Sequence, residues 1–226
     1  AVVHMTNAYG AGLADAFVAN MDASHVCTQV GYEETTTDFS TMAQAVVDAG
    51  CTSVLLVSYA TDGAGIIEEL AGLGYSGAIY GADGIAEEGL AAGMSDTTLV
   101  DGIIATKPAA AGTPGMVAMV FSALCAQSAD CAGGIYTAEA FDAVTIAAFA
   151  AFTALATPGL AAQDAVMGTG QGWNGASGTL SFLANGDVPA AGFCIGEFST
   201  ATDGTVSYDC ARSWDPVNGI TTATTE

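Results

Sequence analysis

The chain has 226 residues, enough for one large or two small domains, and it carries 24 acidic residues against two basic ones, Lys107 and Arg212. Hydrophobic residues make up 51%, which gives a core-forming composition and excludes a disordered or collagen-like chain. The net charge of −22 argues against nucleic acids and anionic membranes as partners. Two basic side chains are also too few for a phosphoryl-transfer enzyme. So acidic a surface is typical of a protein suited to a salty environment.

The first hundred residues alternate between strand and helix patterns, which predicts βαβ units and a parallel sheet. Strands are expected at Val2–Thr6, Val26–Tyr32, Ser53–Ser58, Ala78–Tyr80 and Leu99–Thr106. Helices are expected at Gly12–Asp22, after Asp38 and after Thr61, with a short one at Glu87–Ala92.

The pattern changes at Lys107-Pro108, where the small residues of 109–115 predict a segment that crosses between domains. Helices are expected at Met116–Gln127, Ala138–Ala156 and Leu160–Met167, followed by strands at Gly178–Phe182, Phe193–Phe198 and Thr205–Cys210. Asp203-Gly204 predicts a hairpin between the last two strands. Residues 212–226 are expected to form a polar tail.

A stretch without charges runs from Ala143 to Ala162, but Pro158-Gly159 interrupts it. The remaining residues are fewer than the roughly 20 that a membrane span needs, so we expect a buried helix. No basic segment precedes the apolar strand at Ala1, so no signal peptide is visible, and a processed or incomplete sequence is expected.

Six cysteines form three sequence-local pairs: Cys27 with Cys51, Cys125 with Cys131, and Cys194 with Cys210. Locality favours this pairing among the 15 that six cysteines allow. Three disulfides indicate an oxidising compartment, and the alternative is six buried thiols. None of the cysteines lies in a CxxC motif, and His4 and His25 have no zinc-type spacing, so no metal site is expected.

Motifs for catalysis are absent from the sequence. It contains no G-x-S-x-G, H-E-x-x-H or Walker motif, and no dinucleotide fingerprint follows a strand, so neither an enzyme nor a cofactor is expected. Three adjacent glutamate pairs are typical of solvated surfaces rather than of acid–base sites: Glu33-Glu34, Glu68-Glu69 and Glu87-Glu88.

Three polar residues directly follow predicted strands: Tyr9, Tyr59 and Asp83. Ligands of open parallel sheets bind outside the carboxyl ends of the strands. Two phenols and a carboxylate suit a small ligand that has an ammonium group and an apolar part. The alternative is that the tyrosines only pack and that Asp83 shapes a turn before Gly84.

An ordered set of segments resembles the type I periplasmic binding proteins, in the branch that binds leucine, isoleucine, valine and amides for ABC importers. The segments are Asn7–Ala14, Asp38–Ser40, Leu56–Tyr59, Tyr80–Gly84, Ile135–Ala143, Gly178–Phe182 and Asn185–Asp187. Phe141 stands where a tyrosine is more usual in that family. The similarity covers nearly the whole chain in order.

The resemblance implies an α/β fold with two doubly wound, parallel-sheet lobes that enclose a solute. Residues 1–106 and 190–211 would form the second lobe, and residues 109–187 would complete the first, whose N-terminal part of over a hundred residues is absent from the sequence. Tyr9, Tyr59 and Asp83 match ligand-contacting positions of the second lobe, with Asp83 at the acidic residue that pairs with an ammonium. A glutamate is more common there. Tyr136 matches an aromatic contact from the first lobe.

These expectations lead to an exported protein, periplasmic or extracellular, that captures an amino acid or a similar zwitterion for the membrane subunits of an ABC importer. The alternative from another class is an extracellular structural subunit that assembles with copies of itself. Ligand in the cleft would support the first, and a repeated homotypic interface would support the second.

Overall fold

A computed structural model describes residues 1–109, 115–128, 131, 136–189 and 192–222. The chain divides into two compact units. Unit 1 comprises Ala1–Lys107, Cys194–Ser213 and Ile220–Glu226, and unit 2 comprises Pro108–Phe193 and Trp214–Gly219. Most of the expected crossing segment (110–114), Ile135 of the family-like motif and the last four residues of the expected tail lie outside the described residues.

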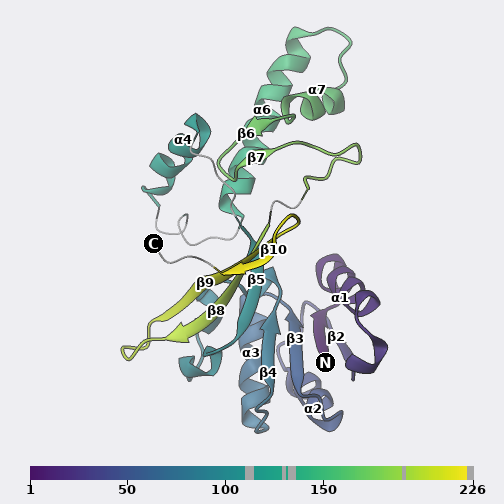
Figure 1. Cartoon of the computed structure of the whole chain (residues 1–226), viewed down its shortest axis with the longest axis vertical. Helices are drawn as coiled ribbons and strands as arrows, with labels where there is room; N and C mark the ends of the chain where they lie inside the picture. Colours follow the sequence, from purple (N-terminus) through teal and green to yellow (C-terminus); the bar gives the residue numbers. More distant parts are fainter. Residues whose placement is uncertain (110–114, 129–130, 132–135, 190–191, 223–226) are drawn as a thin grey trace. The chain divides into compact units, whose positions relative to one another are not determined.

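Unit 1 contains an eight-stranded sheet in the order β10-β9-β8-β5-β4-β3-β1-β2 (Figure 1). Its parallel part consists of β1 (Val2–Met5), β2 (Gln29–Tyr32), β3 (Ser53–Val57), β4 (Ala78–Gly81) and β5 (Ile104–Pro108). The connections hold α1 (Ala8–Asn20), η1 (Ala23–His25), α2 (Ser40–Asp48), α3 (Ala60–Gly72), η2 (Asp83–Ile85), η3 (Glu88–Ala91) and η4 (Thr97–Val100). The α/β class with a parallel sheet is therefore confirmed.

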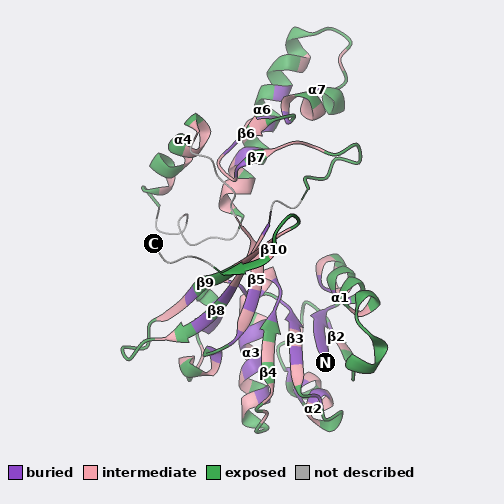
Figure 2. Cartoon of the chain, viewed as in Figure 1, coloured by how far each residue is buried: buried purple, intermediate pink, exposed green. Residues whose placement is uncertain are grey.

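Alternating side chains of the central strands pack on opposite faces of this sheet. Val54 and Leu56 of β3 lie in the cluster that contains the buried residues of α2 and α3, whereas Val57 lies with Ala14 of α1. The sheet is thus covered by α2 and α3 on one face and by α1 on the other, which is the doubly wound arrangement. Figure 2 shows the buried residues gathered along these strands.

The remaining strands of the sheet are β8 (Phe193–Thr200), β9 (Val206–Asp215) and β10 (Gly219–Thr222). The Phe198 amide donates to the Ile103 carbonyl, and the Phe198 carbonyl accepts from the Gly102 amide. The Ala109 amide donates to the Gly192 carbonyl, so β8 runs antiparallel to β5. The prediction of a polar tail is wrong for residues 212–222, because the last residues of β9 and the whole of β10 lie in that range. Polar and apolar residues such as Ser213 and Trp214 alternate in β9, as is typical of a half-buried strand.

Unit 2 contains α4 (Met116–Cys125), α6 (Thr137–Ala156), α7 (Ala162–Thr169) and a two-stranded sheet of β6 (Trp173–Asn174) and β7 (Thr179–Leu180). The expectation of a buried helix is wrong for α6. Its buried residues are Asp142, Ile146 and Ala150, while Phe152 and Leu155 are 71% and 83% exposed. Among the described residues, α6 is the one helix long and apolar enough to cross a membrane, a criterion of length and composition alone.

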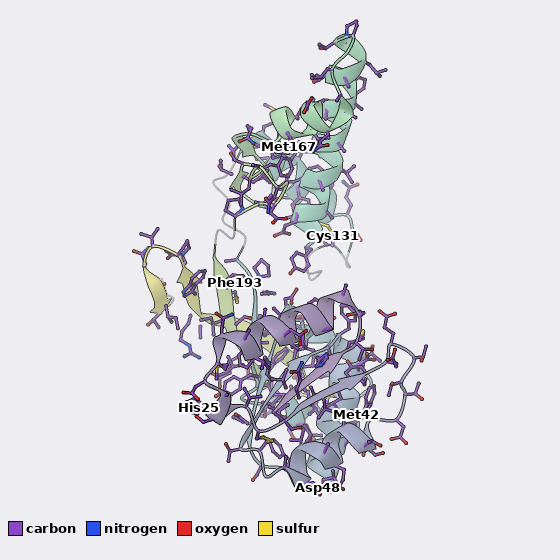
Figure 3. The ribbon with its side chains drawn as sticks, turned by 90° about the vertical axis from the view of Figure 1, so that its right-hand side faces the viewer. His25, Met42, Asp48, Cys131, Met167 and Phe193 are labelled. Atoms are coloured by element: carbon purple, nitrogen blue, oxygen red, sulfur yellow. A yellow bond between two sulfur atoms is a disulfide. The ribbon has the colours of Figure 1, made fainter. Side chains whose placement is uncertain are left out.

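The three cysteine pairs expected from locality are confirmed as disulfides. Cys27–Cys51 joins the segments that precede β2 and β3, with Cα atoms 6.1 Å apart. Cys125–Cys131 closes a short loop after α4 (Cys131 is labelled in Figure 3). Cys194–Cys210 joins β8 to β9. A disulfide stabilises a fold mainly by restricting the unfolded chain.

We expect added salt to raise the melting temperature. Unit 1 holds most of the acidic residues and both basic ones, so repulsion between carboxylates opposes its compact state. Salt shortens the screening length from about 30 Å at 0.01 M to below 8 Å at 0.5 M, which weakens that repulsion. Calorimetric melting between these concentrations measures the effect, and a flat or falling melting temperature contradicts it.

Candidate functional site

Tyr9 lies in the first turn of α1, close to the carboxyl end of β1. Asn7 caps this helix, because its side-chain oxygen accepts a hydrogen bond of 2.8 Å from the Gly10 amide. A side chain at Gly10 would collide with the backbone of Met5, so only glycine allows the helix to approach the strand so closely. The sequence placed the helix start at Gly12, four residues late, because its apolar repeat begins only at Leu13.

Tyr59 and Asp83 reach the same edge of the sheet from the next two strands. Tyr59 is the N-cap residue of α3, after β3, and Asp83 begins η2, after β4. Because β1, β3 and β4 are parallel neighbours, their carboxyl ends meet at one edge. The structure therefore brings together the three unit 1 residues that the sequence singled out.

A hydrogen-bonded and stacked group results at this edge. The Tyr9 hydroxyl donates to Oδ1 of Asp83 at 2.8 Å and accepts from the Gly84 amide at 3.0 Å. The rings of Tyr9 and Tyr59 stack with centroids 5.4 Å apart and planes 16° apart. Tyr59 is 48% exposed, while Tyr9 and Asp83 are half-buried. We call Tyr9, Tyr59 and Asp83 the rim group.

The hydrogen bonds separate the roles of the two tyrosines. The Tyr9 hydroxyl has one proton, and that proton is directed to Asp83, so Tyr9 orients the carboxylate. Tyr59 instead presents a large exposed ring surface beside it. From residue type and spacing alone, both tyrosines were expected to contact the ligand in the same way.

Gly84 is a site residue that sequence reasoning treated only as part of a turn. A side chain here would collide with the Ser58 carbonyl and come within 2.9 Å of the Tyr9 hydroxyl and 3.2 Å of the Tyr59 ring. The close packing of the rim group therefore requires glycine after Asp83. The Asp-Gly sequence at 83–84 was the available signal.

Further carboxylates make this edge of unit 1 negative. Glu34, after β2, accepts a hydrogen bond of 2.8 Å from the Asn7 side chain. Asp62 in the first turn of α3 accepts one of 3.3 Å from Tyr32. Burial raises the pKa of Asp62, and the bond from Tyr32 partly opposes that shift. Lys107 lies at the carboxyl end of β5, the parallel neighbour of β4, and its ammonium lies 4.8 Å from the ring centroid of Tyr208. The carboxylates outnumber this one ammonium, so the edge favours a cationic group over an anionic one.

Tyr136 lies in unit 2, as the N-cap residue of α6, and is 45% exposed. Its φ of 64° is in the left-handed region, which no other described non-glycine residue adopts. It lines a cavity of about 690 Å³ within unit 2, together with Glu139, Phe182 and Phe193. Its expected contact with ligand remains a prediction.

Asp142 also lines this cavity, and the sequence alone did not single it out. It is 1% exposed. Its carboxylate accepts hydrogen bonds from the Trp173 indole, the amides of Ala176 and Ser177, and the Ser177 hydroxyl, at 2.7–3.3 Å. It anchors the β6–β7 turn on α6. No group of three or more possible metal ligands occurs among the described residues.

The fold matches solved structures of solute-binding proteins. A leucine-binding protein from Thermotoga maritima aligns with a TM-score of 0.71 and 18% identity, over 95% of this chain and 60% of that one. A solute-binding protein from R. palustris in complex with 4-hydroxybenzoate gives 0.72 and 16%, over 95% and 60%. A branched-chain amino acid binding protein from Streptococcus pneumoniae in complex with isoleucine gives 0.63 and 16%, over 92% and 58%.

Neither a protein-family model nor a curated protein matches the chain. The chain spans about 60% of the length of the first structures that it matches. At 14–18% identity the likeness concerns the fold. The chain has the α/β fold of the type I periplasmic binding proteins, with one lobe incomplete.

Proposed function

We propose that this chain belongs to an extracytoplasmic solute-binding protein that captures an amino acid or a similar small zwitterion for an ABC importer. The observation that carries the proposal is the rim group, in which the Asp83 carboxylate is oriented by Tyr9 beside the exposed ring of Tyr59. A carboxylate so placed can pair with an ammonium, and the phenol ring can pack against an aliphatic chain. The reaction is binding, without covalent chemistry.

The fold supports the class of function but does not select the ligand. One structure with this fold holds isoleucine, and another holds 4-hydroxybenzoate, which has no ammonium. The choice of an ammonium ligand therefore depends on Asp83 and on the acidic edge around it. The three disulfides support a periplasmic or extracellular location.

Calorimetric titration with three matched ligands tests the proposal. Leucine has both charged groups, 3-methylbutylamine lacks the carboxylate, and 4-methylpentanoate lacks the ammonium. We expect 4-methylpentanoate to bind at least about 100-fold more weakly than leucine, because it leaves Asp83 without a counter-charge. Equal affinity for leucine and 4-methylpentanoate contradicts an ammonium site. Absence of binding by leucine, the other amino acids and their amides contradicts the solute-binding function.

The exposed apolar side chains of α4 and α6 favour a second candidate, a structural subunit that assembles with copies of itself. Met116 of α4 is 82% exposed, and Leu155 of α6 is 83% exposed. Apolar patches of this kind mark interaction surfaces. Light scattering after gel filtration distinguishes the two candidates by molar mass. We expect a solute-binding protein to keep one molar mass at all protein concentrations. A structural subunit would form assemblies whose molar mass increases with concentration, and it would bind no amino acid in the titration.

A further inference from the structure

Three neighbouring strands, β5, β8 and β9, each reach a residue at which the chain passes between unit 1 and unit 2, and a fourth passage follows Gly219 at the start of β10. The boundaries follow Lys107 at the end of β5, precede Cys194 at the start of β8 and follow Ser213 near the end of β9. These strands are neighbours in the sheet, in the order β9-β8-β5. Because the three strands lie side by side, one set of local contacts can hold their ends together.

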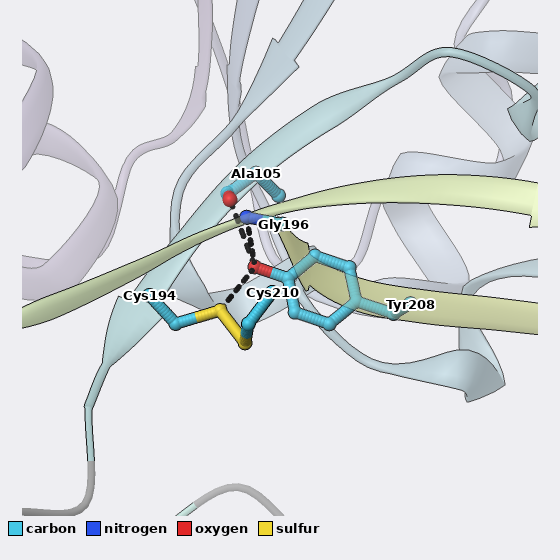
Figure 4. Close-up of a disulfide and its surroundings, with 5 residues drawn as sticks. All are labelled: Ala105, Cys194, Gly196, Tyr208 and Cys210. Carbon is cyan, nitrogen blue, oxygen red and sulfur yellow. Dashed lines mark hydrogen bonds between the residues drawn. A yellow bond between two sulfur atoms is a disulfide. The ribbon is translucent and has the colours of Figure 1, made fainter. Parts of the chain in front are cut away.

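Tyr208 of β9 provides such a structure (Figure 4). Its hydroxyl donates to the Ala105 carbonyl of β5 at 2.8 Å and accepts from the Gly196 amide of β8 at 3.2 Å. The side chain is 9% exposed. A side chain at Gly196 would collide with the Tyr208 ring, so glycine allows the ring to lie against β8. One hydroxyl thus joins all three strands.

The disulfide adds a covalent link at the same place. Cys194 of β8 and Cys210 of β9 are bonded, with Cα atoms 5.5 Å apart, and the sulfur of Cys194 lies 3.6 Å from the Tyr208 hydroxyl. The Lys107 ammonium lies 4.8 Å from the Tyr208 ring centroid, within the range of a cation–π interaction. Burial raises the pKa of Tyr208 to about 12, so its hydroxyl stays protonated near neutral pH.

On the unit 2 side of each boundary the contacts are of another kind. Phe193, labelled in Figure 3, packs on Trp214 with ring centroids 5.9 Å apart, and the Ala109 amide donates to the Gly192 carbonyl at 3.0 Å. Ring packing restrains the chain less than a disulfide and a shared buried hydroxyl do. Among the described residues on the unit 2 side of these boundaries, no disulfide joins the three strands.

We propose that Tyr208 and the Cys194–Cys210 disulfide form a clamp that fixes the ends of β5, β8 and β9 as one rigid block. Any change in the arrangement of the two units then bends these three strands beyond the clamp, at Pro108, Phe193 and Trp214. The Lys107 ammonium lies over the Tyr208 ring at the boundary itself. The clamp is defined by contacts within unit 1 and does not depend on the proposed solute.

Hydrogen exchange of single amides, without ligand, tests the clamp. In the wild type we expect the amides of Gly102, Gly196 and Phe198 to exchange at least about tenfold more slowly than the amide of Ala109, so that protection drops at the boundary. In Tyr208→Phe, which keeps the ring, we expect exchange at Gly102 and Phe198, as well as at Gly196, to rise by about fivefold to tenfold. The Cys194→Ala/Cys210→Ala double variant is expected to do the same.

Two matched variants separate the clamp from a general loss of stability. Tyr75→Phe removes another buried hydroxyl of unit 1, one without a hydrogen-bond partner among the described residues, and Cys27→Ala/Cys51→Ala removes another disulfide of unit 1. Neither is expected to abolish the drop in protection at the boundary. The clamp is contradicted if the wild type shows no such drop, or if Tyr208→Phe changes Gly196 alone. It is also contradicted if the control disulfide variant removes the drop equally. Because the test uses no ligand, its result does not depend on the proposed solute.

Discussion

Replacing Asp142 by alanine is expected to destabilise unit 2 by about 3 kcal/mol or more. The carboxylate is buried and accepts four hydrogen bonds from the segment Trp173–Ser177. Its removal leaves the Ala176 and Ser177 amides without their acceptor, and an unsatisfied buried donor costs about 1–3 kcal/mol. Asp142→Asn keeps one acceptor oxygen but turns an NH₂ group toward these donors, so a large loss is expected there too.

Fluorescence can measure this loss locally. Trp173 donates its indole N–H to Asp142, and Trp214→Phe leaves it as the sole tryptophan. Denaturation followed at Trp173 is expected to shift to lower denaturant in Asp142→Ala. The control is Asp164→Ala, an exposed carboxylate in α7 of the same unit, expected to change stability by less than about 0.5 kcal/mol. Equal stability of the two variants contradicts the anchoring role of Asp142.

Replacing Asp83 by alanine is expected to weaken binding of an amino acid by two to four decades. Closure around a zwitterion removes water from its ammonium, and loss of the opposing carboxylate then costs about 3–5 kcal/mol. Tyr59→Phe removes one hydroxyl and keeps the ring, so about 1 kcal/mol is expected. Tyr9→Phe removes the bond that orients Asp83, and its effect is expected to lie between the two.

A matched charge change distinguishes a local contact from the general field of the acidic surface. Glu69→Ala removes an exposed carboxylate from the far part of α3 and lowers the net negative charge by the same amount as Asp83→Ala. Calorimetric titration is expected to show an unchanged affinity for Glu69→Ala. Similar losses in both variants, or a larger loss in Tyr59→Phe than in Asp83→Ala, contradict the assigned roles.

The parallel sheet of unit 1 could be predicted because its cause is local. Runs such as Ser53–Val57 bury alternate side chains on both faces, and helices of 9–13 residues separate most of the strands. Parallel pairing then brings the carboxyl ends to one edge, which is why the sequence could group Tyr9, Tyr59 and Asp83. The three disulfides followed from locality in the same way.

Features that depend on contacts between distant segments could not be predicted. The start of α1 is set by Asn7 and by the approach of Gly10 to Met5, not by an apolar repeat. The bonds of Asp142 span more than thirty residues of sequence. The exposure of α6 was unpredictable for a related reason: its apolar residues surround the helix, so the pattern does not specify which face is covered.

One comparison tests most directly whether Asp83 binds an ammonium. The affinities of wild type and Asp83→Asn for leucine and for 4-methylpentanoate are measured by calorimetric titration. We expect the wild type to prefer leucine by at least about 100-fold, and we expect Asp83→Asn to lose most of that preference by binding leucine more weakly. If Asp83→Asn keeps the preference of the wild type, the ammonium is recognised elsewhere and the account is contradicted.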